Sequence, residues 1–233
     1  MSIHPFLADY RAMIGDLAVP TPRRHEELDE AFETMRRRRF PEEPALRFVP
    51  SPPKKRRRKR TNEIVTARQT YDGRIAVDRE VPTRAGDLHD HCNFLVWLSF
   101  PRAKRAIHER QLRAKEAWIP EGSTRMPGAR TREQDALTLF DEGGAVLVDA
   151  GAPGASSRLV VFGHALLEHF VRSDVPIAAT TMRVGACETL DGIDRAIAAR
   201  VRDEGSFLAP GLDGLIVLDA RGGYSLAPAG VPR

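Results

Sequence analysis

Polar side chains recur in residues 87–111 at intervals of three, four or seven, the spacing that puts residues on one helix face: Asp90, Asn93, Trp97, Lys104, His108 and Gln111. A carboxylate, an amide, an ammonium and an imidazole beside an indole could line a ligand-binding cleft. A solvated helix face would show the same spacing. We take Asp90 as a candidate catalytic residue, and Asn93, Lys104 and Trp97 as candidate substrate-binding residues.

A second candidate group lies in residues 163–171, where the apolar periodicity predicts a helix. His164 and Glu168 are four residues apart there, so both can face one ligand. His164 follows Gly163 at the start of this helix, where the helix dipole disfavours an imidazolium ion. A neutral imidazole can bind a metal, so we predict His164 and Glu168 as ligands of a divalent cation and His164 also as a catalytic residue. A hydrogen-bonded His–Glu pair that orders a buried turn would fit equally.

Acidic residues flank the apolar run 136–140. Asp135, directly before the run, is the third candidate catalytic residue. Asp141 and Glu142 are interpreted as turn residues at a hairpin tip, where such side chains are common.

Several common motifs are absent from the sequence: a Walker loop, GxGxxG, GxSxG and HExxH. His89 and His91 are two residues apart and would point in nearly opposite directions on a helix, so they would not bind one metal together. Cys92 and Cys187 are distant and have no CxxC partner, which excludes a disulfide framework and a cysteine-rich zinc site within this chain.

Positive charge is concentrated in one run: Lys54, Lys55, Arg56, Arg57, Arg58, Lys59 and Arg60. The 233 residues have a net charge of +4, so removing these seven leaves −3 for the rest. Like charges in a run repel one another and resist burial, which predicts a solvated loop. The loop could contact a polyanion such as nucleic acid, or it could be a surface insertion without a partner.

The composition, 42% hydrophobic and 29% charged, is that of a folded protein. No stretch approaches the roughly 18 apolar residues that span a bilayer, and the N-terminal sequence shows no secretory signal. We therefore expect a cytoplasmic protein that does not enter a membrane.

Periodicity and the Gly and Pro positions predict the elements that must position these residues. Helices are expected at 4–18, 87–99, 101–118, 163–171 and 190–204. A further helix is expected to begin at a Thr21-Pro22 cap and to end at Pro41. Single strands are expected at 45–49, in the few residues before Gly163, and at 177–184. Hairpins are expected within 63–79 (turning at Asp72-Gly73), 136–149 and 215–227.

This mixture of helices and hairpins predicts an α+β fold, with helices packed on small antiparallel sheets. Residues 1–50 are expected to form an N-terminal helical hairpin and first strand, and 51–60 the basic linker. Residues 61–233 would form the main α+β domain, and residues 1–50 would pack against it to give one compact unit.

Three ordered blocks, LHDHCNFLVWLSFPRAKRAIHERQ, DALTLFDEGG and VFGHALLEH, together with LRFVP and EVPTR, resemble the bacterial domain of unknown function 3025 family from about Leu46 to Phe170. The resemblance implies a compact cytosolic domain and no established activity or cofactor. Carried onto this chain, the family pattern marks residues in all three blocks: His89, Asp90, Asn93, Trp97, Pro101, Lys104, Asp135, Phe140, Asp141, Glu142, Gly163, His164 and Glu168. The sequence departs from the pattern at His91-Cys92, so His91 is not counted as a ligand, and the basic run looks like an insertion.

Two functions follow as hypotheses. The first is a site for a small anion, in its most concrete form a metal-assisted phosphoester hydrolase with Lys104 available for a phosphate or carboxylate. The second is a non-enzymatic adaptor or nucleic-acid-associated protein that uses residues 54–60. Convergence of Asp90, Asp135, His164 and Glu168 in one pocket would favour the first.

Overall fold

The computed structural model describes residues 5–18, 23–52, 63–151, 157–208, 212–219 and 221–226. Its α-helices are α1 (Ala8–Ile14), α2 (His25–Arg39), α3 (Tyr71–Gly73), α4 (Leu88–Ser99), α5 (Pro101–Trp118), α6 (Arg132–Gly143), α7 (His164–Arg172) and α8 (Leu190–Arg202). Shorter turns are η1 (Pro5–Leu7), η2 (Gly15–Ala18), η3 (Ala67–Gln69) and the π-helical η4 (Arg74–Asp78).

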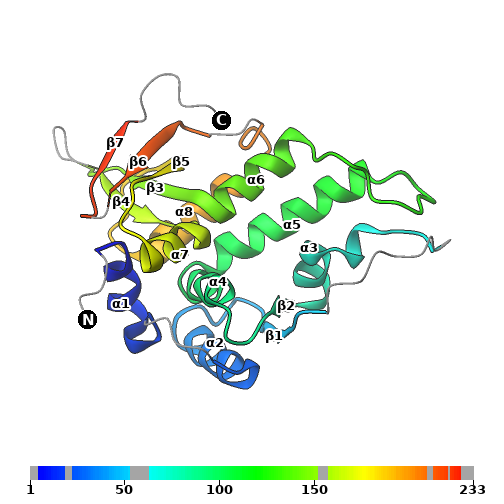
Figure 1. Ribbon diagram of the computed structural model, residues 1–233, viewed down its shortest axis with the longest axis horizontal. Helices are drawn as coiled ribbons and strands as arrows, with labels where there is room; N and C mark the ends of the chain where they lie inside the picture. The colour runs from blue at the N-terminus through cyan, green and yellow to red at the C-terminus, as the bar shows by residue number, and fades with distance from the viewer. Residues whose placement is uncertain are drawn as a thin grey trace.

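The strands are β1 (Arg47–Pro50), β2 (Glu80–Thr83), β3 (Gly144–Val148), β4 (Arg158–Val161), β5 (Ile177–Val184), β6 (Leu215–Leu218) and β7 (Tyr224–Leu226). They form a five-stranded sheet in the order β4-β3-β5-β6-β7 and a separate β1–β2 pair, on different sides of α4 (Figure 1). The predicted α+β class is confirmed. The sheets are not purely antiparallel, because β1–β2 and β3–β5 are parallel pairs.

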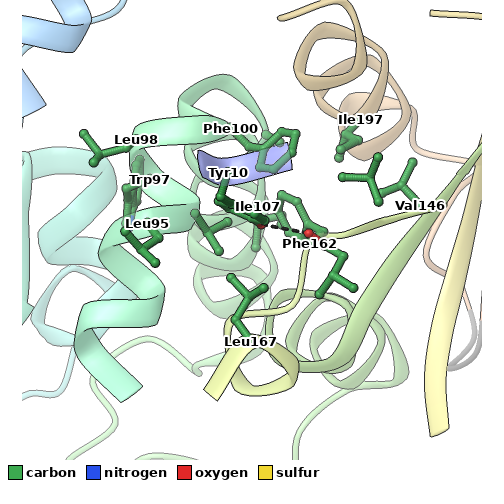
Figure 2. Packing of buried hydrophobic residues seen from close by; sticks show 14 of the residues in the cluster. Tyr10, Leu95, Trp97, Leu98, Phe100, Ile107, Val146, Phe162, Leu167 and Ile197 are labelled. Atoms are coloured by element: carbon green, nitrogen blue, oxygen red, sulfur yellow. Dashed lines mark hydrogen bonds between the residues drawn. The ribbon is translucent and has the colours of Figure 1, made fainter. Parts of the chain in front are cut away.

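Helix α4 lies in the centre of the core. Residues 91–99 are all buried, and a helix that is buried on every side is apolar around most of its circumference. Helices α1, α2, α5 and α7 pack against it. Trp97 and Leu98 are fully buried. Figure 2 shows Phe100, directly after α4, close to the rings of Tyr10 and Phe162 from other elements. The Tyr10 hydroxyl donates to the Val161 carbonyl oxygen at 2.7 Å.

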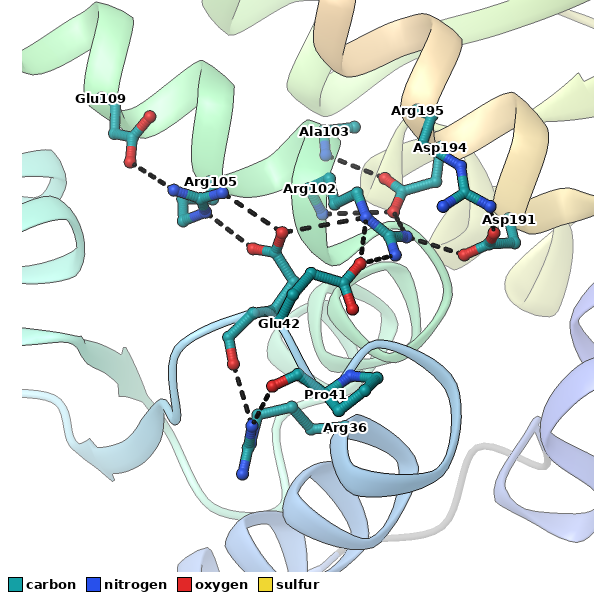
Figure 3. A network of polar contacts seen from close by, with 11 residues as sticks. Arg36, Pro41, Glu42, Arg102, Ala103, Arg105, Glu109, Asp191, Asp194 and Arg195 are labelled. Atoms are coloured by element: carbon teal, nitrogen blue, oxygen red, sulfur yellow. Dashed lines mark hydrogen bonds and ion pairs between the residues drawn. The ribbon is translucent and has the colours of Figure 1, made fainter.

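Helix α5 is fixed at its N-terminus by an acidic side chain from α8. Asp194 accepts hydrogen bonds from the backbone N–H groups of Ala103 (2.8 Å) and Arg102 (3.3 Å), which have no partner within α5. The Arg102 guanidinium also binds Asp191 and Glu42, linking α5 to α8 and to the chain after α2 (Figure 3). This network sets the position of the polar residues farther along α5.

The predicted hairpin within 136–149 is wrong, because residues 132–143 form α6 and only 144–148 form a strand. The helix starts with a capping box, in which Thr131 and Gln134 exchange side-chain and backbone hydrogen bonds. Ala136, Leu137 and Phe140 then face the core at helical spacing. A five-residue apolar run fits either a strand or a helix, and the capping box at Thr131 and Gln134 favours the helix.

The hairpin predicted at Asp72-Gly73 is also wrong, since these residues lie in α3, followed by η4. Thr70 caps this turn by accepting from the Gly73 backbone N–H at 3.3 Å. A Cβ on Gly73 would lie 2.4 Å from the Arg68 carbonyl oxygen, so close backbone packing explains the glycine better than a β-turn does.

The other expected elements correspond to described ones, apart from small shifts at their ends. Asp87 caps α4, accepting from the Asp90 backbone N–H at 3.1 Å. The expected cap at Thr21-Pro22 lies outside the described residues, and α2 begins at His25. Among the described helices, none combines the length and apolarity that crossing a membrane requires. The proposed domain division, with a linker at 51–60, remains a prediction.

Candidate metal centre and adjoining cavity

Three helix ends bring together two imidazole rings and a carboxylate. His89 lies in the first turn of α4, Glu142 in the last turn of α6, and His164 is the first residue of α7. The Nε2 atoms of the two histidines are 3.2 Å apart. Glu142 Oε2 is 3.3 Å from His164 Nε2 and 3.8 Å from His89 Nε2.

A close backbone contact holds α7 against the end of α6. The Gly163 N–H donates to the Gly144 carbonyl oxygen at 2.7 Å. A Cβ on Gly163 would lie 2.4 Å from the Glu142 carbonyl oxygen and 2.5 Å from the Gly144 nitrogen, so only glycine allows this approach. The contact places His164 beside Glu142.

The Nδ1 atoms of both histidines already have partners. His89 Nδ1 donates to Glu168 Oε2, and His164 Nδ1 donates to the Asp141 carbonyl oxygen, each at 2.8 Å. A neutral imidazole that carries its proton on Nδ1 has a lone pair on Nε2. Two lone pairs and a carboxylate oxygen therefore face one another, and these three residues are the group able to hold a metal within the described part of the chain.

Burial and neighbouring charges favour the neutral form of His164. Burial, followed by the Lys104 ammonium, lowers the pKa of His164 to about 3. Burial, followed by the charge of Asp141, raises the pKa of Glu142 above its usual range. A bound cation would favour the ionised Glu142 and leave His164 neutral, the forms that metal ligands take.

A cavity of about 370 Å³ adjoins the three residues. Its lining is largely polar and comes from α3, α4, α5 and α6 and the segments around them. Arg130 lines it as an exposed side chain with no hydrogen bond or ion pair to the residues that the structure describes. Arg84, in contrast, is held by Asp87 and Asp90. Arg130 is therefore available to an anionic ligand.

Two ion pairs support the cavity, and in one of them the lysine is fully buried. Lys104 Nζ lies 2.5 Å from Asp141 Oδ1, with the lysine side chain wholly inaccessible to solvent. Asp72 accepts from His108 Nδ1 at 2.8 Å and from Lys115. Burial alone would raise the pKa values of Asp72 and Asp141, but the His108 and Lys115 contacts and the Lys104 charge hold the respective pKa values below the usual range.

One part of the cavity lining has unsatisfied hydrogen-bonding capacity. Asn93 Oδ1, His108 Nε2 and Gln111 Oε1 are buried and have no hydrogen-bond partner in the described part of the chain. An unsatisfied buried polar atom costs about 1–3 kcal/mol, which a ligand or water can offset. These atoms indicate a binding surface.

Comparison with known families assigns part of this region. Residues 60–153 match the sequence model described as protein of unknown function (DUF3025). The predicted resemblance is thus confirmed over this segment. The DUF3025 segment contains His89 and Glu142, whereas His164 and Glu168 follow it. Neither the curated proteins nor the solved structures gave a match to the chain.

The structure brings some of the predicted site residues together. His164, Asp90 and Asn93 line the cavity, with Asp90 paired to Arg84. Glu168 is not one of the three residues whose atoms could hold a metal; it binds Nδ1 of His89, which is one of them.

The remaining predicted residues lie elsewhere. Lys104 is buried against Asp141 and Trp97 is stacked on His108, and neither lines the cavity. Asp135 lies in α6, outside the cavity lining. The basic run 54–60 falls outside the described residues, so its nucleic-acid role remains a prediction.

Sequence reasoning gave too little weight to His89 and Glu142. His89 was considered with His91, and Glu142 was assigned to a turn that does not form. The signal that could have identified them was the family pattern, which marks both. Asp72 and its contact with His108 carried no such signal, because the two are 36 residues apart.

Proposed function

We propose that this protein is a metal-dependent hydrolase of small phosphate monoesters, with His89, His164 and Glu142 as the metal ligands. The observation that carries the proposal is that two imidazole Nε2 atoms and one carboxylate oxygen lie 3.2, 3.3 and 3.8 Å from one another. Without a cation between them, these atoms repel one another. The Nδ1 bonds to Glu168 and to the Asp141 carbonyl are the supporting contacts that metal-binding histidines usually have.

The interatomic distances suit a tetrahedral ion such as zinc. Ligand atoms about 2.0–2.1 Å from zinc lie about 3.3 Å from one another in a tetrahedron. The separations here are 3.2, 3.3 and 3.8 Å. Two histidines and a carboxylate, with a fourth position open to the cavity, are one of the ligand sets of catalytic zinc.

In the proposed reaction, water attacks phosphorus and the P–O bond to the alcohol breaks. The leaving oxygen takes up one proton, which balances the proton that the attacking water gives up, so the products are inorganic phosphate and the neutral alcohol. The metal would supply Lewis-acid activation of water and substrate. Arg130 would bind the phosphate oxygens as a charge-assisted hydrogen-bond donor. Glu168 would hold the His89 ring in the orientation that directs Nε2 at the metal.

The test combines metal binding with hydrolysis by the full chain. We expect metal-stripped protein to bind one zinc or manganese ion by calorimetric titration and, once loaded, to release phosphate from p-nitrophenyl phosphate. His89→Ala, His164→Ala and Glu142→Gln should each abolish both. Glu168→Gln should weaken metal binding about 10–100-fold without abolishing it.

His169→Ala is the matched control, since His169 lies on the same helix as His164 but bonds to the Val175 carbonyl oxygen. It should bind metal as wild type does. The alternative arrangement is a proton shared between the two Nε2 atoms. Wild type that binds neither zinc nor manganese, and whose unfolding temperature does not change when these ions are added, would support the shared proton and refute the hydrolase. Metal binding without turnover would support a small-anion-binding domain instead.

A further inference from the structure

The unsatisfied atoms of Asn93, His108 and Gln111 form one wall of the cavity, which we call the acceptor wall. All three side chains are more than nine-tenths buried. Asn93 comes from α4, and the other two lie three residues apart on α5. Two separately anchored helices therefore bring residues with unused polar atoms to the same cavity.

The two amide oxygens among these atoms are hydrogen-bond acceptors. Gln111 Nε2 donates to the Gln134 carbonyl oxygen at 3.0 Å, and a carbonyl only accepts, so the other atom of the amide is Oε1. Asn93 Nδ2 donates to the Tyr71 hydroxyl at 3.2 Å, which leaves Oδ1 unpaired. His108 binds the Asp72 carboxylate through Nδ1, so Nε2 is the ring nitrogen left without a partner, and it accepts a hydrogen bond in the neutral form of the ring.

A ligand at this wall must therefore donate hydrogen bonds. The charges nearby argue against an ammonium group. Among the carboxylates that line the cavity, Asp72 already has Lys115 as its cationic partner, Asp141 has Lys104 and Asp90 has Arg84. The fourth, Glu142, is the proposed metal ligand. With the metal bound, an ammonium group would gain no unpaired countercharge to offset its desolvation. Neutral hydroxyl groups meet the requirement without adding charge.

We propose that the acceptor wall is a subsite for the hydroxyl groups of the substrate, so that the preferred substrates are phosphorylated polyols. The orientation of the substrate rests on the proposed function. Asn93 is four residues beyond His89 on α4, which puts it on the same helix face about 6 Å farther along. A small molecule could then place its phosphate at the metal and Arg130, and its hydroxyls at the acceptor wall.

The test compares two ligands that differ only in hydroxyl groups. We expect metal-stripped wild type, which cannot hydrolyse either ligand under the proposed mechanism, to bind glycerol 3-phosphate at least tenfold more tightly than n-propyl phosphate, measured by calorimetry. A site that hydrogen-bonds hydroxyls discriminates strongly against an analogue that lacks them. Equal affinity for the two compounds, or no binding of either at millimolar concentration, would overturn the inference.

Two variants locate the discrimination. Asn93→Leu and Gln111→Met each remove one acceptor, and each should reduce the preference to threefold or less while leaving the affinity for zinc within twofold of wild type. Thr180→Val is the matched control, because Thr180 Oγ1 is also buried without a hydrogen-bond partner among the described residues but is outside the cavity. It should keep the full preference. A preference that persists in both acceptor variants would refute the assignment.

Failure of the hydrolase and failure of the subsite give different results. If the protein binds no metal but still binds glycerol 3-phosphate more tightly than n-propyl phosphate, and loses that preference in Asn93→Leu, the acceptor wall is supported and the metal-dependent reaction is refuted. If it binds zinc and hydrolyses p-nitrophenyl phosphate but has equal affinity for glycerol 3-phosphate and n-propyl phosphate, the hydrolase is supported and the acceptor wall is refuted.

Discussion

Replacing Lys104 by methionine should destabilise the protein more than most single substitutions do. The Lys104 side chain is fully buried and lies 2.5 Å from Asp141, whose side chain is 14% exposed. Methionine has a similar length and no charge, so the change removes the ion pair and leaves the Asp141 carboxylate without its counterion. Removing one partner of a buried pair typically costs about 3–5 kcal/mol.

The cost can be measured by urea unfolding at pH 7.5, followed by circular dichroism. Adding Asp141→Asn to Lys104→Met removes the unpaired charge and should recover more than half of the lost stability. Lys115→Met is the control. Asp72 keeps its hydrogen bond from His108 there, and Lys115 is partly exposed, so we expect a smaller cost of about 1–2 kcal/mol.

Two results would refute this reasoning. One is a loss below about 1 kcal/mol in Lys104→Met, which would show that the pair contributes little beyond its desolvation cost. The other is a double variant no more stable than Lys104→Met, which would show that the effect came from packing around Trp97 rather than from the unpaired carboxylate.

Three further predictions concern the backbone, pH and the basic run. Gly163→Ala should cost about 1–3 kcal/mol and weaken metal binding, whereas Gly143→Ala, whose added Cβ meets nothing within 4 Å, should do neither; equal effects on urea unfolding would contradict this. Because His164 has a pKa of about 3 in the folded protein against about 6.5 unfolded, the unfolded state binds more protons between these values. The unfolding free energy of metal-free protein should therefore fall as the pH drops from 6.5 to 4.5, and less steeply in His164→Asn; parallel curves would disprove the assignment. Replacing residues 54–60 by a Gly/Ser linker should leave the unfolding temperature nearly unchanged and flatten the salt dependence of any DNA binding, and loss of cooperative unfolding would show the run to be structural.

The sequence by itself determined the α+β class and most of the elements that carry the site. The Asp87 cap and the break at Pro101 fixed α4 and α5, because caps and prolines act within a few residues of the chain. The same local rules placed Gly163 at the entry to α7. They failed for α6, where a short apolar run fits either a strand or a helix.

Only the tertiary structure decided which polar residues share a site. His89 meets His164 across 75 residues of sequence, and His108 meets Asp72 across 36. Spacing along one helix restricts residues to a face but contains no information about which other element packs there. The exchange of roles between Glu168 and Glu142 follows from this. Helical spacing paired Glu168 with His164, but packing directed Glu168 to His89 and brought Glu142, from the end of a different helix, to the two imidazoles.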